Sequence, residues 1–188
     1  MSIFDKLKST AQTAAQTAAQ SVSGAKSESF TFDALPESVD ELKALPEAAL
    51  ATPFQAAALT VCALCAYAAE PGIGIEMLNF LKGPQPLSPY ELSFLKERFS
   101  SNPAYLPFSY FKGAAPDNDY TPDRPFTVTV EANPYSFEQE GYAVLHLTSG
   151  GADSPRQVKL RRKGEQWFLW EQMLLVGIRK SRSEDPWA

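Results

Sequence analysis

The only two cysteines of the chain, Cys62 and Cys65, have the C-x-x-C spacing that redox thiol pairs and zinc sites both use. A capping box at 52–55 (TPFQ), with proline at the first helical position, predicts a helix that begins at Pro53. Cys62 then lies more than two turns inside that helix, whereas a reactive thiol needs the free N–H groups of a helix N-terminus. A zinc site would need further ligands, but the chain has no third cysteine and His146 is its only histidine. We therefore expect both thiols to be buried in the core, without a redox or metal role.

Polar residues that could bind a ligand alternate along four short segments in the C-terminal half. The segments FTVTVEA (126–132), GYAVLHLTSG (141–150), RQVKLRRK (156–163) and QWFLWEQ (166–172) have the two-residue period of strands. Each has one apolar face. The other face of the predicted sheet would gather the candidate ligand-binding residues Glu131, Tyr142, His146, Lys159, Arg161 and Trp170. The basic segment RQVKLRRK could bind an acidic partner or a phosphate group. The alternative is that its charged side chains only form a solvent-exposed strand face.

Catalysis at His146 is the competing hypothesis. His146 could act with Glu131 or Tyr142 in a sheet-lined cavity, as in a small hydrolase or isomerase. The chain contains none of the motifs G-x-S-x-G, G-x-x-x-x-G-K-[ST], H-E-x-x-H or G-x-G-x-x-G. A deep pocket that encloses His146 beside a carboxylate would favour an enzyme, and a flat sheet face would favour a binding protein.

The elements that must position these residues are predicted to be helices in the N-terminal half of the chain and strands in the C-terminal half. Capping boxes at 38–41, 52–55 and 88–91 mark three helix starts. A further helix is expected at about 75–82, and the helix at 89–99 is expected to turn Tyr90 and Phe94 toward the core. The predicted fold is α+β, with N-terminal helices packed on a C-terminal antiparallel four-stranded meander.

Residues 100–125 form an aromatic and proline-rich segment without a clear period. We expect an ordered strap packed over the helices, and the alternative is one wall of a binding groove. Asp117, Asp119, Thr121 and Asp123 alternate as calcium ligands do. A calcium loop is rejected, however, because proline and valine occupy its sixth and twelfth positions, where glycine and glutamate are needed.

Two tryptophans near the C-terminus should lie on opposite faces of one strand. Trp167 and Trp170 are three residues apart, and the side-chain period of a strand is two. We expect residues 173–187 to fold back and cover the outward tryptophan, because MLLVGI is too apolar to be left in water. The alternative is an open face with that tryptophan as a binding anchor.

Residues 1–29 are predicted to form a low-complexity, weakly helical tail that contains the segment TAQTAAQTAAQ. Residues 30–188 are predicted to form a single domain. Contact of residues 1–20 with a membrane is a disfavoured alternative, because few large apolar residues would enter the bilayer. The net charge of −5 disfavours nucleic acid as a partner, although residues 156–182 hold eight Lys/Arg against two acids. A reducing, cytoplasmic location is expected, and no cofactor is predicted.

Several stretches resemble an uncharacterised bacterial family whose members carry names such as hypothetical or virulence-related protein. They are MLNFLKGPQPLSPYE (77–91), SYFKGAAPDNDYTP (109–122), GYAVLHLTSGGADSPRQVKLRRK (141–163) and QWFLWEQMLLVGIR (166–179), followed by DPWA. The resemblance covers about residues 30–188 and implies no established activity and no functional residues. The order of helices, hairpins, a basic strand and a tryptophan strand is also similar to the cone-shaped α+β folds of nuclear-transport-factor-like proteins, a likeness of fold only.

Together these patterns favour a non-catalytic cytoplasmic accessory or binding domain. It would use the sheet face and the aromatic strap to hold another protein or a small ligand.

Overall fold

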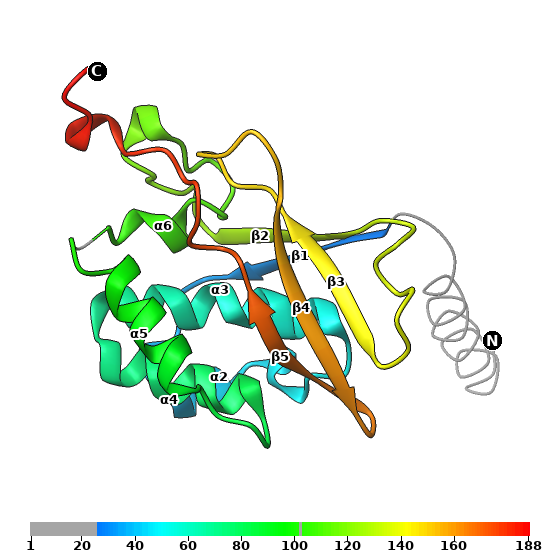
Figure 1. The fold of residues 1–188 in the computed structure, drawn as a ribbon. Coiled ribbons are helices and arrows are strands. Elements are labelled where there is room, and N and C mark those ends of the chain that lie inside the picture. Colours follow the sequence, from blue (N-terminus) through cyan, green and yellow to red (C-terminus); the bar gives the residue numbers. More distant parts are fainter. Residues whose placement is uncertain (1–25, 102) are drawn as a thin grey trace, which may run out of the picture.

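A computed structural model describes residues 26–101 and 103–188 of the 188-residue chain (Figure 1). The predicted helical tail lies outside the described residues as far as residue 25, and so does the membrane contact of residues 1–20 that the sequence disfavours. The described elements are, in order, β1 (Lys26–Phe32), α2 (Val39–Ala44), η2 (Pro46–Ala49), α3 (Pro53–Ala69), α4 (Pro71–Lys82), α5 (Pro89–Arg98), α6 (Tyr105–Phe108), η3 (Pro116–Asn118), β2 (Phe126–Ala132), β3 (Tyr142–Leu147), β4 (Arg156–Lys163), β5 (Gln166–Gln172) and η4 (Arg182–Glu184).

The fold is α+β, as predicted, but the antiparallel sheet has five strands rather than four. Its order is β1-β2-β3-β4-β5, so the predicted four-strand meander is extended by β1, which pairs with β2. Residues 26–29, which the sequence assigned to the tail, belong to this strand. The segment KSESFTF reads as a polar linker, yet its backbone pairs along the whole of β2, and Ser29 and Thr129 share a side-chain hydrogen bond of 2.7 Å.

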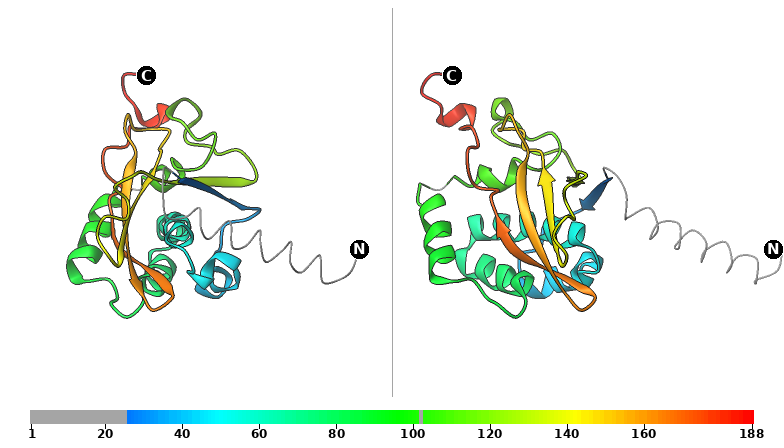
Figure 2. Two further views of the ribbon diagram at one scale, coloured as in Figure 1. Left: turned by 90° about the vertical axis from the view of Figure 1, so that its right-hand side faces the viewer. Right: turned by 45° about the vertical axis from the view of Figure 1, so that its right-hand side comes forward.

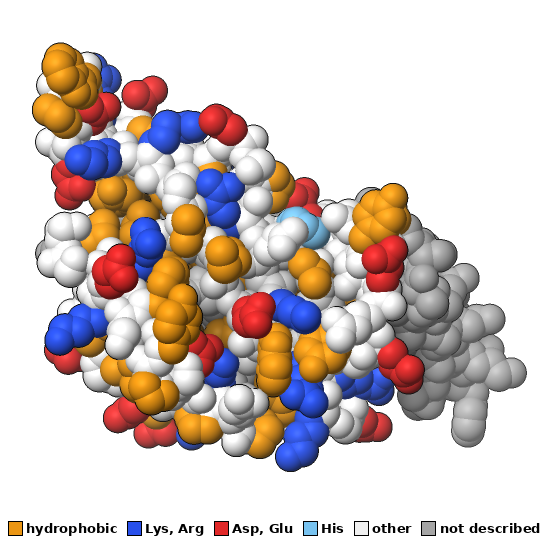
Figure 3. Space-filling model, viewed as in Figure 1, with side chains coloured by type: hydrophobic (Ala, Val, Ile, Leu, Met, Phe, Trp, Pro, Cys, Tyr) orange, Lys and Arg blue, Asp and Glu red, His pale blue; other side chains and the backbone are white. Residues whose placement is uncertain are grey.

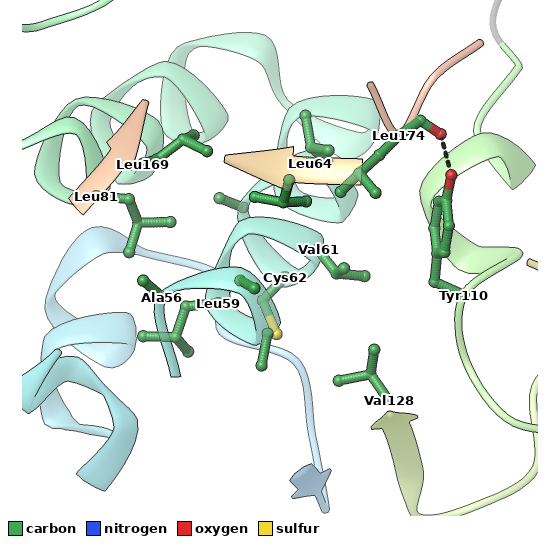
Figure 4. Close-up of a cluster of buried hydrophobic side chains, with 14 of the residues drawn as sticks. Ala56, Leu59, Val61, Cys62, Leu64, Leu81, Tyr110, Val128, Leu169 and Leu174 are labelled. Atoms are coloured by element: carbon green, nitrogen blue, oxygen red, sulfur yellow. Dashed lines mark hydrogen bonds between the residues drawn. The ribbon is translucent and has the colours of Figure 1, made fainter. Parts of the chain in front are cut away.

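The core lies between the inner face of the sheet and α3. This helix is apolar all round and buried along nearly its whole length, as predicted. Its fully buried side chains include Leu59, Cys62 and Leu64 (Figure 4). Figure 2 shows α3 enclosed by the curved sheet on one side and by neighbouring helices on the other. No helix within the described residues is long and apolar enough to cross a membrane.

Helix α4 begins at Pro71, four residues before the predicted start. Proline is tolerated there because the first helical N–H has no partner within the helix. The start brings Gly74 against α3, where an added Cβ atom would lie 2.3 Å from the Cα atom of Tyr67. Helices α3 and α4 can therefore approach closely only because this position has no side chain.

Helix α5 lies beside the free edge of β5 and turns only part of its apolar residues inward (Figure 1). Leu95 is buried and Phe94 is half-buried. Tyr90, which was expected to face the core, is 79% exposed, so that prediction was wrong. With a single fully buried residue, α5 flanks the core rather than crossing it.

The aromatic segment at 100–125 is ordered over its described residues and includes α6 and η3. Its aromatic residues Tyr110, Phe111 and Tyr120 are buried, and α6 contacts α3. The Tyr110 hydroxyl donates to the carbonyl of Leu174 (Figure 4). The prediction of a packed strap is therefore confirmed for these residues.

The final segment does not cover the outer sheet face, contrary to expectation. Leu174 and Leu175 turn into the core, which removes the apolar part of the segment from water. The chain then runs along the β3–β4 loop, where the Arg179 N–H donates to the Gly151 carbonyl, and along the strap, where the Ser183 N–H donates to the Asp119 carboxylate. Trp187 is 93% exposed.

Candidate functional site

The two cysteines lie in the core, as predicted (Figure 4). Burial raises the pKa of Cys62 far above the usual range for a thiol, and the Glu47 carboxylate adds to the effect. Burial also raises the pKa of Cys65, and the nearby Cys62 adds a smaller effect in the same direction. Both side chains are thus held as neutral thiols. Within 26–101 and 103–188, no cluster of three or more His, Cys, Asp or Glu residues could hold a metal ion.

Four of the six candidate residues form one cluster on the outer face of the sheet. The Arg161 guanidinium lies 4.6 Å from the ring of Trp170 and 5.5 Å from the ring of Tyr142. The Lys159 ammonium lies 4.7 Å from the ring of Tyr142, and the two rings meet edge to face at 5.9 Å. We call Tyr142, Lys159, Arg161 and Trp170 the outer-face cluster.

The strand register explains why these residues meet. Tyr142 of β3 pairs with Arg161 of β4. Between β4 and β5 the register shifts at Lys159 and Leu160, which leaves Trp170 as an extra residue of β5 without a directly opposed partner. A bulge of this kind re-aims a side chain. Trp167 packs against the core and Trp170 joins the outer face, so the prediction of opposite faces is confirmed.

The basic side chains around this cluster form no ion pair among the described residues, although Glu171 of β5 lies directly opposite Lys159 of β4. The ion pairs among the described residues are Lys26–Glu28, Lys82–Glu91, Arg98–Glu97 and Arg179–Asp153. Lys159, Arg161, Arg162 and Lys163 take part in none of them. Figure 3 shows basic and hydrophobic side chains side by side over this part of the sheet.

Glu131 and His146 lie together but apart from the cluster. They are direct cross-strand partners of β2 and β3. The Thr148 hydroxyl donates to Glu131 at 3.4 Å, and His146 Nε2 lies 3.4 Å from the side-chain amide nitrogen of Gln157. His146 is four residues from Tyr142 along β3, which is about 13 Å. Sequence reasoning placed all six residues on one face, and the structure separates them into two groups.

A pocket that the sequence did not reveal opens next to the cluster, between α4, α5 and β5. Its volume is about 440 Å³. Its walls include Leu64, Leu78, Phe94, Leu95 and Leu169. Tyr90 and Met173, both well exposed, also line it. We call it the α5–β5 pocket. Strap residues and His146 do not line it.

An almost fully buried lysine lies at one end of this pocket. Lys82 is 7% exposed, and its ammonium donates to the Glu91 carboxylate at 2.6 Å and to the Trp170 carbonyl at 3.2 Å. Glu91 also accepts the Ser88 N–H and the Ser88 hydroxyl, each at 2.8 Å. Partial burial on its own would raise the pKa of Glu91, but the hydrogen bonds from Lys82 and Ser88 outweigh it and hold that pKa below its usual value. The capping box at 88–91 was visible in the sequence, but the lysine that joins it was not.

A second pocket of about 350 Å³ adjoins the first. The two share Lys82, Gln85, Leu169 and Trp170 among their lining residues. Three cations of β4 also line the second pocket: Arg161, Arg162 and Lys163. We call it the basic pocket. An apolar cavity and a basic one thus meet at Lys82, beside the outer-face cluster.

The free edge of β5 is blocked where it passes these pockets. β5 is the last strand of the sheet, and such an edge can accept an added strand. Here the Trp167 N–H donates to the Leu50 carbonyl, and the Trp170 carbonyl accepts from Lys82. An extended peptide cannot pair with these two groups without displacing their present partners.

Comparison with known proteins gives one match. The model of a family described as a domain of unknown function (DUF6935) matches residues 34–182, more than three quarters of the chain. No curated protein and no solved structure matches. The likeness to nuclear-transport-factor-like folds therefore stays a prediction.

Proposed function

The chain belongs to the DUF6935 family of unknown function, which confirms the predicted membership of an uncharacterised family, and we propose that it is a non-catalytic binding domain for an anionic ligand. The ligand would bind at the outer-face cluster. The expected bacterial origin, accessory role and cytoplasmic location are retained as parts of this proposal.

The observation that carries the proposal is the position of Arg161. Its guanidinium is exposed to solvent, lies over the rings of Trp170 and Tyr142 at 4.6 and 5.5 Å, and is not paired with a carboxylate among the described residues. These contacts limit the freedom of the side chain before a ligand arrives, so less entropy is lost on binding. A planar guanidinium is suited to a carboxylate or phosphate group. Lys159 supplies a second positive charge, 4.7 Å from the ring of Tyr142.

The enzyme alternative has less support. An enzyme would require His146 to lie in a deep pocket beside a carboxylate. His146 lines neither of the two pockets, and its side-chain hydrogen-bond partner is the amide of Gln157, although Glu131 lies directly opposite it on β2.

The proposal is tested by titrating the protein with hexaglutamate at low salt, using calorimetry. We expect Arg161→Gln to weaken binding by about fivefold or more, which is roughly 1 kcal/mol. Arg124→Gln is the matched control, because Arg124 is also exposed and stacks on a ring, that of Phe126, at 4.0 Å. Equal binding by the wild type and by both variants would rule the proposal out.

A further inference from the structure

We propose that the ligand is a small amphipathic anion, with its apolar tail in the α5–β5 pocket and its head group in the basic pocket. This inference rests on the proposed function, because it uses the same cation, Arg161, for the head group. It adds the class of ligand and a second binding surface.

The α5–β5 pocket has the depth and walls that an apolar tail needs. Leu64, Leu78, Leu95 and Leu169 form its apolar floor and are almost completely buried. The apolar side chains that a tail would contact first are the more exposed Leu87, Tyr90, Phe94 and Met173. Its volume of about 440 Å³ is in the range of about 300–1,000 Å³ that is usual for small-molecule sites. A flat protein surface would not fill such a cavity.

The charged residues of the pocket favour an uncharged tail. Lys82 and Glu91 neutralise each other at 2.6 Å, so this pair offers no net charge to a ligand. Glu171, which also lines the pocket, would repel an anionic group placed there. The anionic end of the ligand must therefore lie elsewhere.

The basic pocket supplies that place. Arg161, Arg162 and Lys163 line it, and none of them has an acidic partner among the described residues. The two pockets share four lining residues, so one molecule can occupy both. The head group can be a carboxylate or a phosphate, since both suit this set of cations.

An extended peptide fits these observations less well than a small molecule. Peptides often bind by adding a strand to a sheet edge. On β5 the Trp167 N–H already donates to the Leu50 carbonyl, and the Trp170 carbonyl already accepts from the Lys82 ammonium.

The test measures binding of five probes by calorimetry, with decanoate and decyl phosphate below their micelle concentrations and decanol below its solubility limit. Decanoate and decyl phosphate carry tail and head, decanol carries the tail, and acetate and inorganic phosphate carry the head. We expect decanoate to bind at least about tenfold more tightly than acetate, because burial of methylene groups is favourable. We also expect it to bind more tightly than decanol. A tighter complex with decyl phosphate than with decanoate would identify a phosphate head, and the reverse a carboxylate.

Two pairs of variants separate the contributions of tail and head. Tyr90→Ala should weaken the binding of decanoate by about threefold or more. Tyr135→Ala, which changes a similarly exposed tyrosine outside the pocket, should leave it unchanged. Lys163→Gln should weaken the binding of decanoate but not that of decanol. Lys112→Gln should change the binding of neither probe. All four side chains are exposed, so the variants are expected to fold.

The outcomes distinguish the two proposals. If decanoate binds no better than acetate while hexaglutamate binding still depends on Arg161, the amphipathic ligand is wrong and anion binding stands. If decanoate and decanol bind alike and Arg161→Gln affects neither hexaglutamate nor decanoate, both proposals are wrong. If hexaglutamate carrying a leucine displaces decanoate and depends on Tyr90, the occupant is an acidic peptide and this inference is overturned.

Discussion

Lys82 and Glu91 form an ion pair whose two side chains are buried to different degrees, 6% and 31% exposed. Removing one partner of a buried pair is costly because the other charge stays buried and uncompensated. Glu91→Gln leaves the more buried charge alone and should lower the free energy of unfolding by about 2 kcal/mol. Lys82→Met should cost about half as much, because Glu91 can still reach water and methionine fits apolar surroundings. Urea unfolding measures both.

Glu97→Gln is the matched control for that comparison. Glu97 is largely exposed and lies 4.0 Å from Arg98. Exposed pairs of this kind contribute about 0–1 kcal/mol, so this variant should be near wild type. A larger loss in Lys82→Met than in Glu91→Gln would contradict the assignment of Lys82 as the more deeply buried charge.

Glu91 should also make stability depend on pH. Its pKa is held below the usual value in the folded protein, so the folded state favours the ionised carboxylate. The stabilisation is complete above about pH 4.3, where an unfolded glutamate titrates, and is lost as the pH falls through the lower folded pKa. The difference in unfolding free energy between the wild type and Glu91→Gln should therefore shrink between pH 5 and pH 3. A difference that grows toward low pH would contradict the direction of the shift.

The two thiols should be unreactive in the native protein. Burial raises the pKa values of Cys62 and Cys65 and keeps them from forming the thiolate that reagents attack. At pH 8, a chromogenic disulfide reagent should label both quickly in denaturant and at least about a hundredfold more slowly without it, since labelling then requires unfolding. Native labelling at the denatured rate would show that the helix does not hide them.

At the scale of elements, the contact between α3 and α4 depends on Gly74. A Cβ atom there would lie 2.3 Å from Tyr67 Cα, and a backbone atom cannot move aside cheaply. Gly74→Ala should therefore destabilise the protein by about 2 kcal/mol, despite the better helix propensity of alanine. Gly72→Ala is the control. It stands in the same first turn of α4, and its added Cβ atom would meet only the Glu70 side chain, at 3.7 Å. Thermal unfolding should show Gly72→Ala unchanged or slightly more stable.

Strand β1 changes the expectation for truncation of the N-terminus. The sequence assigned residues 1–29 to a low-complexity tail, and removal of such a tail is expected to cost little stability. The structure places residues 26–29 in β1, paired with residues 129–132 of β2. Removal of residues 1–29 should therefore lower Tm by at least about 3 °C compared with removal of residues 1–25, which corresponds to about 1 kcal/mol for a chain of this size. Equal Tm values would show that this half of β1 contributes nothing to stability.

At the scale of the whole molecule, the sequence predicted what depends on local pattern and missed what depends on distant contacts. The period of two predicted β2 to β5, and capping boxes predicted the starts of α2, α3 and α5. β1 was missed because KSESFTF is polar and gains its place only from a partner about 100 residues away. The cover of the outward tryptophan by residues 173–187 was wrongly predicted because the sequence does not show that Leu174 and Leu175 turn into the core.

The same limit applies to the candidate site. Alternation along β3, β4 and β5 brought Tyr142, Lys159, Arg161 and Trp170 to one face, as predicted. The α5–β5 pocket was not predicted because it forms where the exposed side of α5 meets the edge of β5. No sequence signal reports a gap between two elements, or the lysine of α4 that lies at its end.

The pairing of the first strand with a strand so far along the chain has a consequence for biosynthesis. All the described helices from α2 to α6 lie between β1 and β2, so bringing these two strands together closes a very long loop. On a ribosome, β1 emerges first and must wait until β2 has been translated, with its backbone groups unpaired in the meantime. The helices and the β2–β5 meander involve closer partners and can assemble earlier. We expect the amides of β1 to be the last of the sheet to gain protection in pulse-labelled refolding. Protection of β1 before β4 would show that the longest loop closes first.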